Sequence, residues 1–336
     1  MDTFISLDHG SGGLASQNLI SGLFLKHLTS PQLRDLEDCA VLGEYAGRIA
    51  LSTDSYVVDP LFFPGGDIGA LAVHGTINDL AMRGARPLAL SLALIIEEGF
   101  SLASLERIIA SVARASEAAG VAIVTGDTKV VPRGKGDKIF ITTSGIGVFA
   151  HALEIGGGGA RAGDKLLING PIGDHGLAVL AGREGLELET DIRSDSAPLN
   201  HLVGALLDEF GDAVHVLRDP TRGGVATTLK EIARQSQVRI ELDEKALPVH
   251  PAVVGACALL GLDPLFVANE GKLLALVAPA AADALLERMR RHPQGQGAAL
   301  IGEVTAESPG QVQLHTAIGG RRAIEMLAGE QLPRIC

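Results

Sequence analysis

The sequence lacks tryptophan, and aromatic residues make up only 3% of its 336 residues. Proteins that bind single-stranded nucleic acids stack the bases on aromatic side chains, so such a surface is not expected here. Basic residues are also too few, because 28 Lys and Arg stand against 40 Asp and Glu, which gives a formal net charge of −12. This charge disfavours general affinity for nucleic acid or anionic membranes, and we expect neither as a partner.

Cysteine is equally scarce, since the chain has only Cys39, Cys257 and Cys336. An odd and widely spaced set does not form a disulfide framework, which favours a cytoplasmic protein. The apolar residues around Cys39 and Cys257 predict that both are buried as small hydrophobic side chains. The lack of a Cys-x-x-Cys pair disfavours a zinc site. Cys336 is the last residue, and it is either the end of a frayed tail or a reactive group on a flexible arm.

Long hydrophobic runs are also missing, because no apolar stretch reaches the ~20 residues that span a bilayer. The start of the chain, MDTFISLDHGSGG, lacks the basic and apolar regions of a secretory signal. Strands and helices are instead predicted to alternate. In the first half we expect strands at 48–58, 87–96, 121–131 and 137–149, and helices at 67–85 and 102–119. Ser101 and Gly120 provide the capping signals of the second helix.

Four consecutive glycines at 156–159 interrupt this alternation. We therefore predict two α/β (α+β) domains, at 1–150 and 151–326, followed by a mobile tail at 327–336 that carries the terminal Cys. In the second domain we expect strands at 165–170, 238–242, 271–279 and 298–304. Helices are expected from residue 177, at 251–262 and at 284–292, with a further helix opening after the sequence RDPTRGG.

Aspartates recur where apolar segments of the first half meet loops: Asp38, Asp54, Asp79 and Asp127. Each could be a cap or turn residue. Four of them in one predicted domain, with few basic residues at pairing distance, suit a hard divalent cation such as Mg²⁺, which takes oxygen ligands and bridges substrate phosphates.

Glycine-rich loops are the second recurring feature. The sequence HGSGG, with Gly10, Ser11, Gly12 and Gly13, precedes a helical segment, and its N–H groups could bind a phosphate. A flexible leader is the alternative. The turn RDPTRGG places Arg218 and Arg222 beside two glycines at a helix start, which is either an anion site or a solvated turn. Glu270 lies in NEGKLL at the entrance to a strand. It is either a functional group or one of the solvated charges of a loop.

Taken together, these segments resemble a superfamily of ATP-using enzymes that includes aminoimidazole ribonucleotide synthetase, selenophosphate synthetase and thiamin-monophosphate kinase. The resemblance rests on STDSYVVDPLFFPGGDIGALAVHGTINDLAMRGARP, IVTGDTKVV and RDPTRGG. Within the superfamily, HGSGG, FFPGGDIG, NEGKLL and the terminal PRIC resemble the HypE family, the carbamoyl dehydratases of nickel–iron hydrogenase maturation. The chain departs from the superfamily at EDCAV, where Glu37 and Asp38 replace two adjacent aspartates.

The resemblance implies that Cys336 accepts a carbamoyl group from the carbamoyltransferase HypF. ATP then drives dehydration of this thiocarboxamide to a thiocyanate, and the cyanide passes to iron on a HypC–HypD complex. It also implies a homodimer through the N-terminal sheet, with ATP near the dimer seam. The implied ATP ligands are Gly10, Ser11, Gly12, Gly13, Asp54, Asn78, Asp79, Asp127 and Arg222. The implied Mg²⁺ ligands are Asp38, Asp54, Asp79 and Asp127.

The chemistry of dehydration adds two expectations. A base must remove protons from the carboxamide nitrogen, and we assign Glu270 to this step. Lys129 is expected to orient or polarise the carboxamide or phosphate. We expect Pro333 to stiffen the tail, and Arg334 to dock it on an acidic surface or a phosphate.

Two alternatives remain open from the sequence. One is another superfamily activity, a small-molecule kinase or a selenophosphate synthetase, although the latter carries a reactive Cys or selenocysteine near its N-terminus that this chain lacks. The other is a scaffold without catalytic activity that binds nucleotide as a switch.

Overall fold

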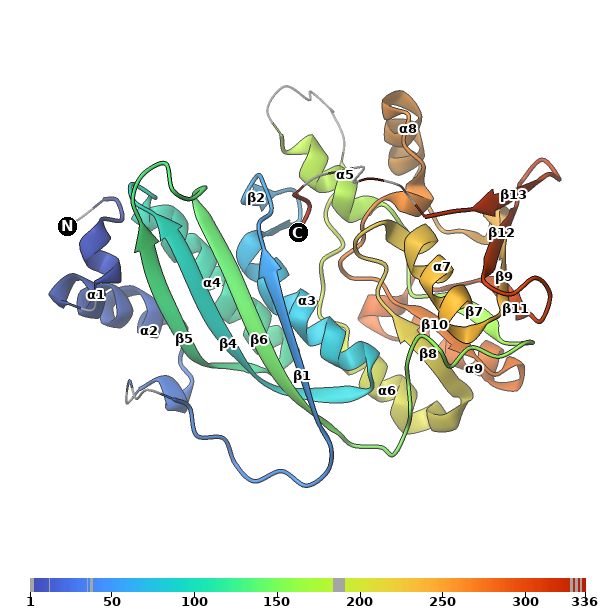
Figure 1. Cartoon of the computed structure of the whole chain (residues 1–336), viewed down its shortest axis with the longest axis horizontal. Coiled ribbons are helices and arrows are strands. Elements are labelled where there is room, and N and C mark those ends of the chain that lie inside the picture. Colours follow the sequence, from blue (N-terminus) through green and yellow to red (C-terminus); the bar gives the residue numbers. More distant parts are fainter. Residues whose placement is uncertain are drawn as a thin grey trace.

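The protein is described by a computed structural model that covers residues 3–11, 13–34, 36, 39–183, 191–326, 329, 332 and 334–336. Two β-sheets, one in each half of the chain, organise the fold (Figure 1). Within these residues, no helix is both long and apolar enough to cross a membrane. The predicted Gly12, Asp38 and Pro333, together with Glu37, lie outside the described residues.

The N-terminal half contains a four-stranded sheet with the order β1–β6–β4–β5. β4 runs parallel to β5 and antiparallel to β6, and β6 is antiparallel to β1. The bounds are β1 Ile49–Tyr56, β4 Ala85–Glu97, β5 Ala122–Val131 and β6 Ile139–Phe149, with a small separate pair β2 Phe62–Phe63 and β3 Gly66–Asp67. All four strands of the main sheet were expected from their β-branched and apolar sequences.

Two helices, α3 (Ile68–Met82) and α4 (Leu102–Ala119), cover one face of this sheet (Figure 1). Ser101 caps α4 as predicted, and Gly120 ends it in the left-handed conformation with φ 66°. The carboxylate of Asp67 caps α3 by accepting from two backbone N–H groups. α3 is buried on almost every side because it also contacts the C-terminal half through α6 and β8.

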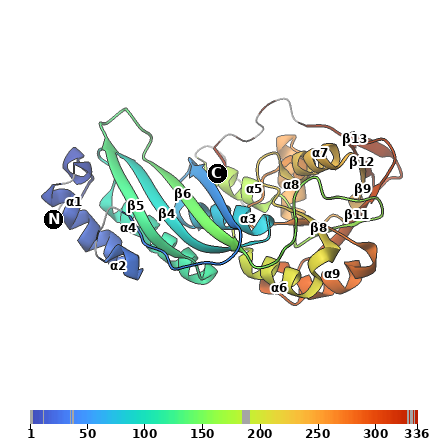
Figure 2. The same ribbon diagram turned by 60° about the horizontal axis from the view of Figure 1, so that its bottom comes forward.

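The other face of the N-terminal sheet, here called the open face, is not covered by helices. Ile49 and Leu51 of β1 are 66% and 72% exposed on it, and Ile95 of β4 is 45% exposed. The N-terminal helices α1 (Leu14–Leu19) and α2 (Leu25–His27) lie beyond β5, at the far end from the C-terminal half (Figure 2). The open face therefore presents these apolar side chains to solvent beside the polar Thr53, Ser55, Thr142 and Ser144.

The C-terminal half contains a seven-stranded sheet with the order β13–β12–β9–β11–β7–β10–β8, in which only β9 and β12 pair in parallel. The strands are β7 Lys165–Ile168, β8 Val214–Arg218, β9 Arg239–Asp243, β10 Leu274–Val277, β11 Ala299–Thr305, β12 Gln311–His315 and β13 Arg321–Ile324. The helices are α5 Asp174–Ala181, α6 Asn200–Phe210, α7 Gly224–Ser236, α8 Pro251–Leu260 and α9 Ala282–Arg290. This confirms a two-part mixed α/β fold.

Several expectations about single elements need correction. The helix expected from residue 177 begins at Asp174. β8, β12, β13 and α6 were not predicted, because the three strands are only four or five residues long and α6 begins without a side-chain cap. Cys257 is buried as expected, but the prediction for Cys39 is wrong. Cys39 lies in an irregular stretch before β1, where the apolar residues that follow it form no strand, and it is exposed.

Candidate active site

The C-terminal residues lie against the end of β1, between the two halves of the molecule (Figures 1 and 2). The N–H of Val57 donates to a main-chain oxygen of the terminal Cys336 at 3.1 Å, and the N–H of Asp59 donates to the Arg334 carbonyl at 3.3 Å. Arg334 Nε donates in turn to the Val57 carbonyl at 2.9 Å. The chain end thus pairs with the backbone that continues β1, as an added strand would.

Side chains from both halves hold the docked tail. Arg334 forms an ion pair with Asp137, so it meets an acidic side chain as the sequence predicted. Arg183 donates from Nη2 to the Arg334 carbonyl at 3.2 Å. His175 Nε2 lies 3.0 Å from the carbonyl oxygen of Ile335, which is itself 5% exposed. The described end of the segment expected to be mobile is therefore bound in this structure.

A pocket of about 550 Å³ opens beside the terminal residue, and its wall includes Cys336, Arg222, Gly223 and Thr227. Gly223 and Gly224, the N-cap and the first residue of α7, both have positive φ, 73° and 61°. Such a turn presents backbone N–H groups together with the positive end of the helix dipole. The RDPTRGG turn therefore forms a surface suited to anions next to the terminal cysteine.

Four carboxyl groups from both halves influence one another at the seam. Burial raises the pKa of Asp79, and the nearby Asp54 raises it further, although a 2.8 Å hydrogen bond from Ser52 opposes this. Burial, with Asp79 close by, raises the pKa of Asp219 to about 7. Burial raises the pKa of Glu270 well above its usual range, and Asp219 adds to the effect. The raised pKa values indicate that the surroundings do not fully stabilise a negative charge on Asp79, Asp219 and Glu270.

Arginines border the same cluster. Asp79 and Asp219 line a second pocket of about 560 Å³ together with Arg83, Arg218 and Arg222. Arg218 is held by Glu231 at 2.9 Å. Carboxylates that could bind a cation and guanidinium groups that could bind phosphates are therefore present in one pocket.

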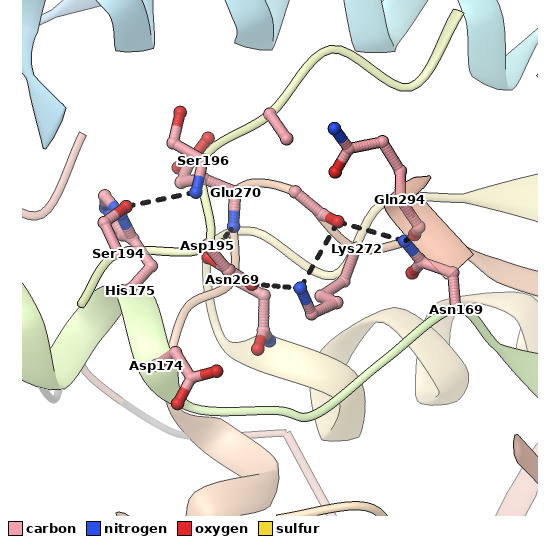
Figure 3. Close-up of polar contacts among 12 residues, drawn as sticks. Asn169, Asp174, His175, Ser194, Asp195, Ser196, Asn269, Glu270, Lys272 and Gln294 are labelled. Atoms are coloured by element: carbon pink, nitrogen blue, oxygen red, sulfur yellow. Dashed lines mark hydrogen bonds and ion pairs between the residues drawn. The ribbon is translucent and has the colours of Figure 1, made fainter. Parts of the chain in front are cut away.

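Glu270 is placed by contacts that its backbone makes (Figure 3). Its N–H donates to Asp195 Oδ1 at 3.1 Å, and its carbonyl accepts from Asn78 Nδ2 at 3.2 Å. Lys272 Nζ lies 3.2 Å from Asp195 Oδ2. Among the described residues no hydrogen bond reaches the Glu270 carboxyl, which belongs to a residue only 3% exposed. The loop is thus fixed while its acidic group stays available.

Asn78 was expected to bind the nucleotide, but its amide already has protein partners. Nδ2 donates to the carbonyls of Glu270 and Ala197, and Oδ1 accepts from the Leu199 N–H at 2.8 Å. The side chain is 1% exposed. In this structure Asn78 braces the seam, and its contact with nucleotide stays a prediction.

The remaining predicted residues lie elsewhere in the chain, at β5. Asp127 and Lys129 form an ion pair at 3.0 Å and are more than 60% exposed. The HGSGG loop packs beside them, since a Cβ on Gly10 would lie 2.6 Å from the Val130 nitrogen. Ser11 and Gly13 are exposed in the same loop. Asp127 is thus one of the four predicted aspartates that has a basic partner, two residues along its own strand.

Strand register separates Asp127 from Asp54. Asp127 lies in one row with Ala93, Thr142 and Ser55, whereas Asp54 pairs with Thr143. Since side chains alternate along a strand, Asp54 points towards α3 and Asp127 points to the open face, three strand spacings or roughly 14 Å away. In the part of the chain that is described, no three His, Cys, Asp or Glu side chains are close enough to hold a metal ion.

Several residues of the site were not predicted, among them His175, Asp195 and Asp219. Asp219 is part of RDPTRGG, where the predicted anion site rested on the arginines alone. Asp195 lies between two serines in RSDSAP, which is indistinguishable in sequence from a solvated loop. His175 follows a Gly-rich turn and carries no local signal, because its partners are far away in sequence.

Family models match both halves of the chain. The N-terminal domain of AIR synthase related proteins matches residues 36–149, and the C-terminal domain matches residues 161–315. Carbamoyl dehydratase HypE of Cupriavidus necator is 56% identical over 333 residues, 99% of this chain and 95% of the relative. This chain belongs to the carbamoyl dehydratase HypE family.

Solved structures of HypE proteins have the same fold. A hydrogenase maturation protein HypE in complex with ATP is 54% identical with a TM-score of 0.94, covering 98% of this chain and 99% of the other. HypE in a HypE–HypF complex is 48% identical with a TM-score of 0.81, covering 92% and 99%. The resemblance of the sequence to the HypE family is thereby confirmed.

Proposed function

We propose that the protein uses ATP to dehydrate a carboxamide carried on Cys336 to a thiocyanate, which supplies cyanide during hydrogenase maturation. The observation that carries the proposal is the position of Cys336, which is docked at the wall of a pocket that the Arg222–Gly223 turn also lines. The HypE protein solved with ATP, at 54% identity, supports the choice of nucleotide.

The reaction proceeds in two steps whose atoms balance. The carboxamide oxygen attacks the γ-phosphorus, the bond to ADP breaks, and the nitrogen gives up one proton. The carbon–oxygen bond then breaks with phosphate as the leaving group, the second N–H proton is lost, and the S–C≡N product remains. Phosphoryl transfer depends mainly on positioning and charge stabilisation, which the Gly223–Gly224 turn and Arg222 would supply.

Glu270 would accept a proton from the carboxamide nitrogen. Its raised pKa means that its anion, once formed, is a stronger base than that of an ordinary glutamate. Ala268, two residues earlier, lines the pocket with Cys336, so the Glu270 loop borders the docked tail. Binding of cations or loss of a neighbouring carboxylate charge would lower the Glu270 pKa towards a working value.

Mg²⁺ fits part of the predicted ligand set. Asp54 and Asp79 provide carboxylate oxygens on the same side of the sheet, and Mg²⁺ commonly uses one or two carboxylates together with substrate phosphates. The bound ion would neutralise phosphate charge. Asp127 of the same chain faces away, so a set of four aspartates from one chain does not fit.

A homodimer formed through the open face would resolve this separation. The exposed side chains of Ile49, Leu51 and Ile95 would be buried there, because exposed apolar side chains that lie together often mark a protein–protein interface. The Asp127–Lys129 pair also lies on this face, so pairing would bring it to the seam between protomers. The predicted role of Lys129 therefore depends on the dimer.

Two partners complete the proposal. We propose that HypF carbamoylates Cys336, in keeping with the HypE–HypF complex known for a relative, and that a HypC–HypD complex receives the cyanide. Cys336 must leave its docked position to reach either partner. The three cysteines form no disulfide, which suits reactions in a reducing cytoplasm.

The test is intact-mass analysis of the protein after incubation with HypF, carbamoyl phosphate and ATP. We expect a carbamoyl adduct on the C-terminal peptide that loses water only with hydrolysable ATP. Cys336→Ser should carry no adduct, and Cys39→Ser, a matched change at an exposed cysteine, should behave as wild type. ATP-dependent turnover of a small molecule that is insensitive to Cys336→Ser would point to the kinase alternative.

A further inference from the structure

A buried histidine that the proposed chemistry does not use contacts the end of the docked tail. His175 is the second residue of α5 and is 0% exposed. Its Nε2 lies 3.0 Å from the Ile335 carbonyl oxygen, directly before Cys336, and its Nδ1 lies 2.8 Å from Ser194 Oγ. Both nitrogens of the imidazole are thus engaged, one of them by the reactive end of the chain.

The partners determine which nitrogen carries the proton. A carbonyl oxygen can only accept, so Nε2 must be protonated and must donate to Ile335. Burial lowers the pKa of His175, so the ring is neutral and Nδ1 is an acceptor. The Ser194 hydroxyl therefore donates to Nδ1, while Ser194 Oγ accepts from the Ser196 N–H at 3.1 Å (Figure 3). The Ile335 carbonyl thus selects the tautomer, and the Ser194 hydroxyl supports it by donating to the other ring nitrogen.

The surroundings of His175 keep the ring in place. Phe63 packs edge-on against it with ring centroids 5.5 Å apart. Ser194 is directly followed by Asp195, whose carboxylate accepts from the Glu270 N–H. A short segment, 194–196, therefore touches both the residue that holds the tail and the loop that carries the proposed base (Figure 3).

We propose that His175 is a positioning residue for Cys336. By donating Nε2–H to the Ile335 carbonyl, it fixes the last peptide of the tail and so orients the cysteine against the pocket. Through the 194–196 segment it holds the docked tail in register with the Glu270 loop. The effect on dehydration rests on the proposed function, whereas the effect on docking does not.

Two substitutions separate the tail contact from packing. In His175→Gln the amide nitrogen replaces Nε2 and can still donate to Ile335. In His175→Asn the shorter amide reaches only the Nδ1 position, so the Ser194 contact survives and the tail contact is lost. The measurement is the rate of iodoacetamide alkylation of Cys336, followed by mass spectrometry of the C-terminal peptide, in the full-length protein without nucleotide.

We expect His175→Asn to increase this rate roughly three- to tenfold, the effect of losing one hydrogen bond on the docked population. His175→Gln should restore it to within about twofold of wild type. The matched control is His74→Asn, since His74 is another buried histidine that bonds this segment, through Ser196 at 2.9 Å, and has no hydrogen bond to the described residues of the tail. It should leave the rate unchanged.

A second readout uses carbamoylated protein in a single turnover with ATP. His175→Asn should lower the rate constant at saturating ATP and leave the ATP concentration for half-saturation unchanged. If wild-type protein shows no dehydration, the proposed function fails, and the alkylation result still tests His175.

Equal alkylation rates in His175→Asn, His175→Gln and wild type would overturn the proposal, as would equal increases in both variants. Thermal unfolding verifies that each variant is folded. If His175→Asn does not fold, Ser194→Ala replaces it. Loss of the hydroxyl removes the hydrogen bond to Nδ1 that helps to keep the imidazole ring oriented towards Ile335. A two- to threefold faster alkylation is then expected, and no change would refute the role of His175.

Discussion

Asp219 offers a quantitative test of the acidic cluster. The residue follows β8, is partly buried and lies near Asp79, and these surroundings raise its pKa from 3.8 to about 7. At about 1.36 kcal/mol for each pH unit, this difference corresponds to a loss of at most about 4 kcal/mol of folding free energy. Asp219→Asn keeps the size of the side chain and removes the charge that causes the loss.

The sign of the effect follows from proton binding. Below pH 3.8 the carboxyl is protonated in both the folded and the unfolded chain, so it contributes nothing to the pH dependence. Between pH 3.8 and about 7 the folded chain keeps a proton that the unfolded chain has released, and wild-type stability falls as the pH rises. Above about 7 both states are ionised and the full loss is reached.

Urea unfolding followed by circular dichroism, repeated from pH 4 to pH 8, measures this difference. The stability of Asp219→Asn relative to wild type should grow across this range and level off above pH 7. Asp212→Asn, a change at an exposed aspartate before the same strand, should show no such trend. A pH-independent difference for Asp219→Asn would refute the raised pKa, and with it the view that these carboxylates await a cation.

Three further outcomes are expected. Glu270→Gln should still be carbamoylated by HypF but should not dehydrate the adduct, and wild-type dehydration should rise with pH because Glu270 must first lose its proton; full activity of Glu270→Gln in a single turnover would exclude it as the base. Leu51→Lys should convert a dimer to a monomer in light scattering, whereas an intact dimer would place the interface elsewhere. Gly224→Ala should lower stability by roughly 1–3 kcal/mol in urea unfolding, since its Cβ would meet the Leu265 carbonyl at 2.6 Å; an unchanged midpoint would contradict the tight turn.

The first-half elements were predictable because their signals are local. α4 has a hydroxyl cap at Ser101, an apolar stripe and a left-handed Gly120, and each of these acts within one or two turns of helix. The run 87–96 within β4 is long and uncharged, which suits a strand that α3 and α4 cover on one face. β12 and β13 are short, and they are strands only because each pairs with a neighbour, which the sequence does not reveal.

The candidate site was predictable in its chemistry and only partly in its geometry. Four residues could be selected from the sequence: Asp54, Asp79, Arg222 and Glu270. Burying a charged side chain costs free energy unless it is paired or binds a ligand, so charged residues beside apolar segments indicate a site. That Asp127 faces the opposite side of the sheet depends on the register between β5, β4, β6 and β1. Register is decided by pairing between strands, so spacing along the chain could not separate Asp127 from Asp54.

The sequence by itself determined the family and the types of reactive group. It also showed a terminal cysteine that is far from the other two cysteines along the chain. These are properties of local motifs and of composition. Only the tertiary structure decided that the tail pairs with Val57, that Arg334 meets Asp137, and that His175 holds the last peptide bond. These contacts join residues more than 150 positions apart, and burial between two folded halves creates them.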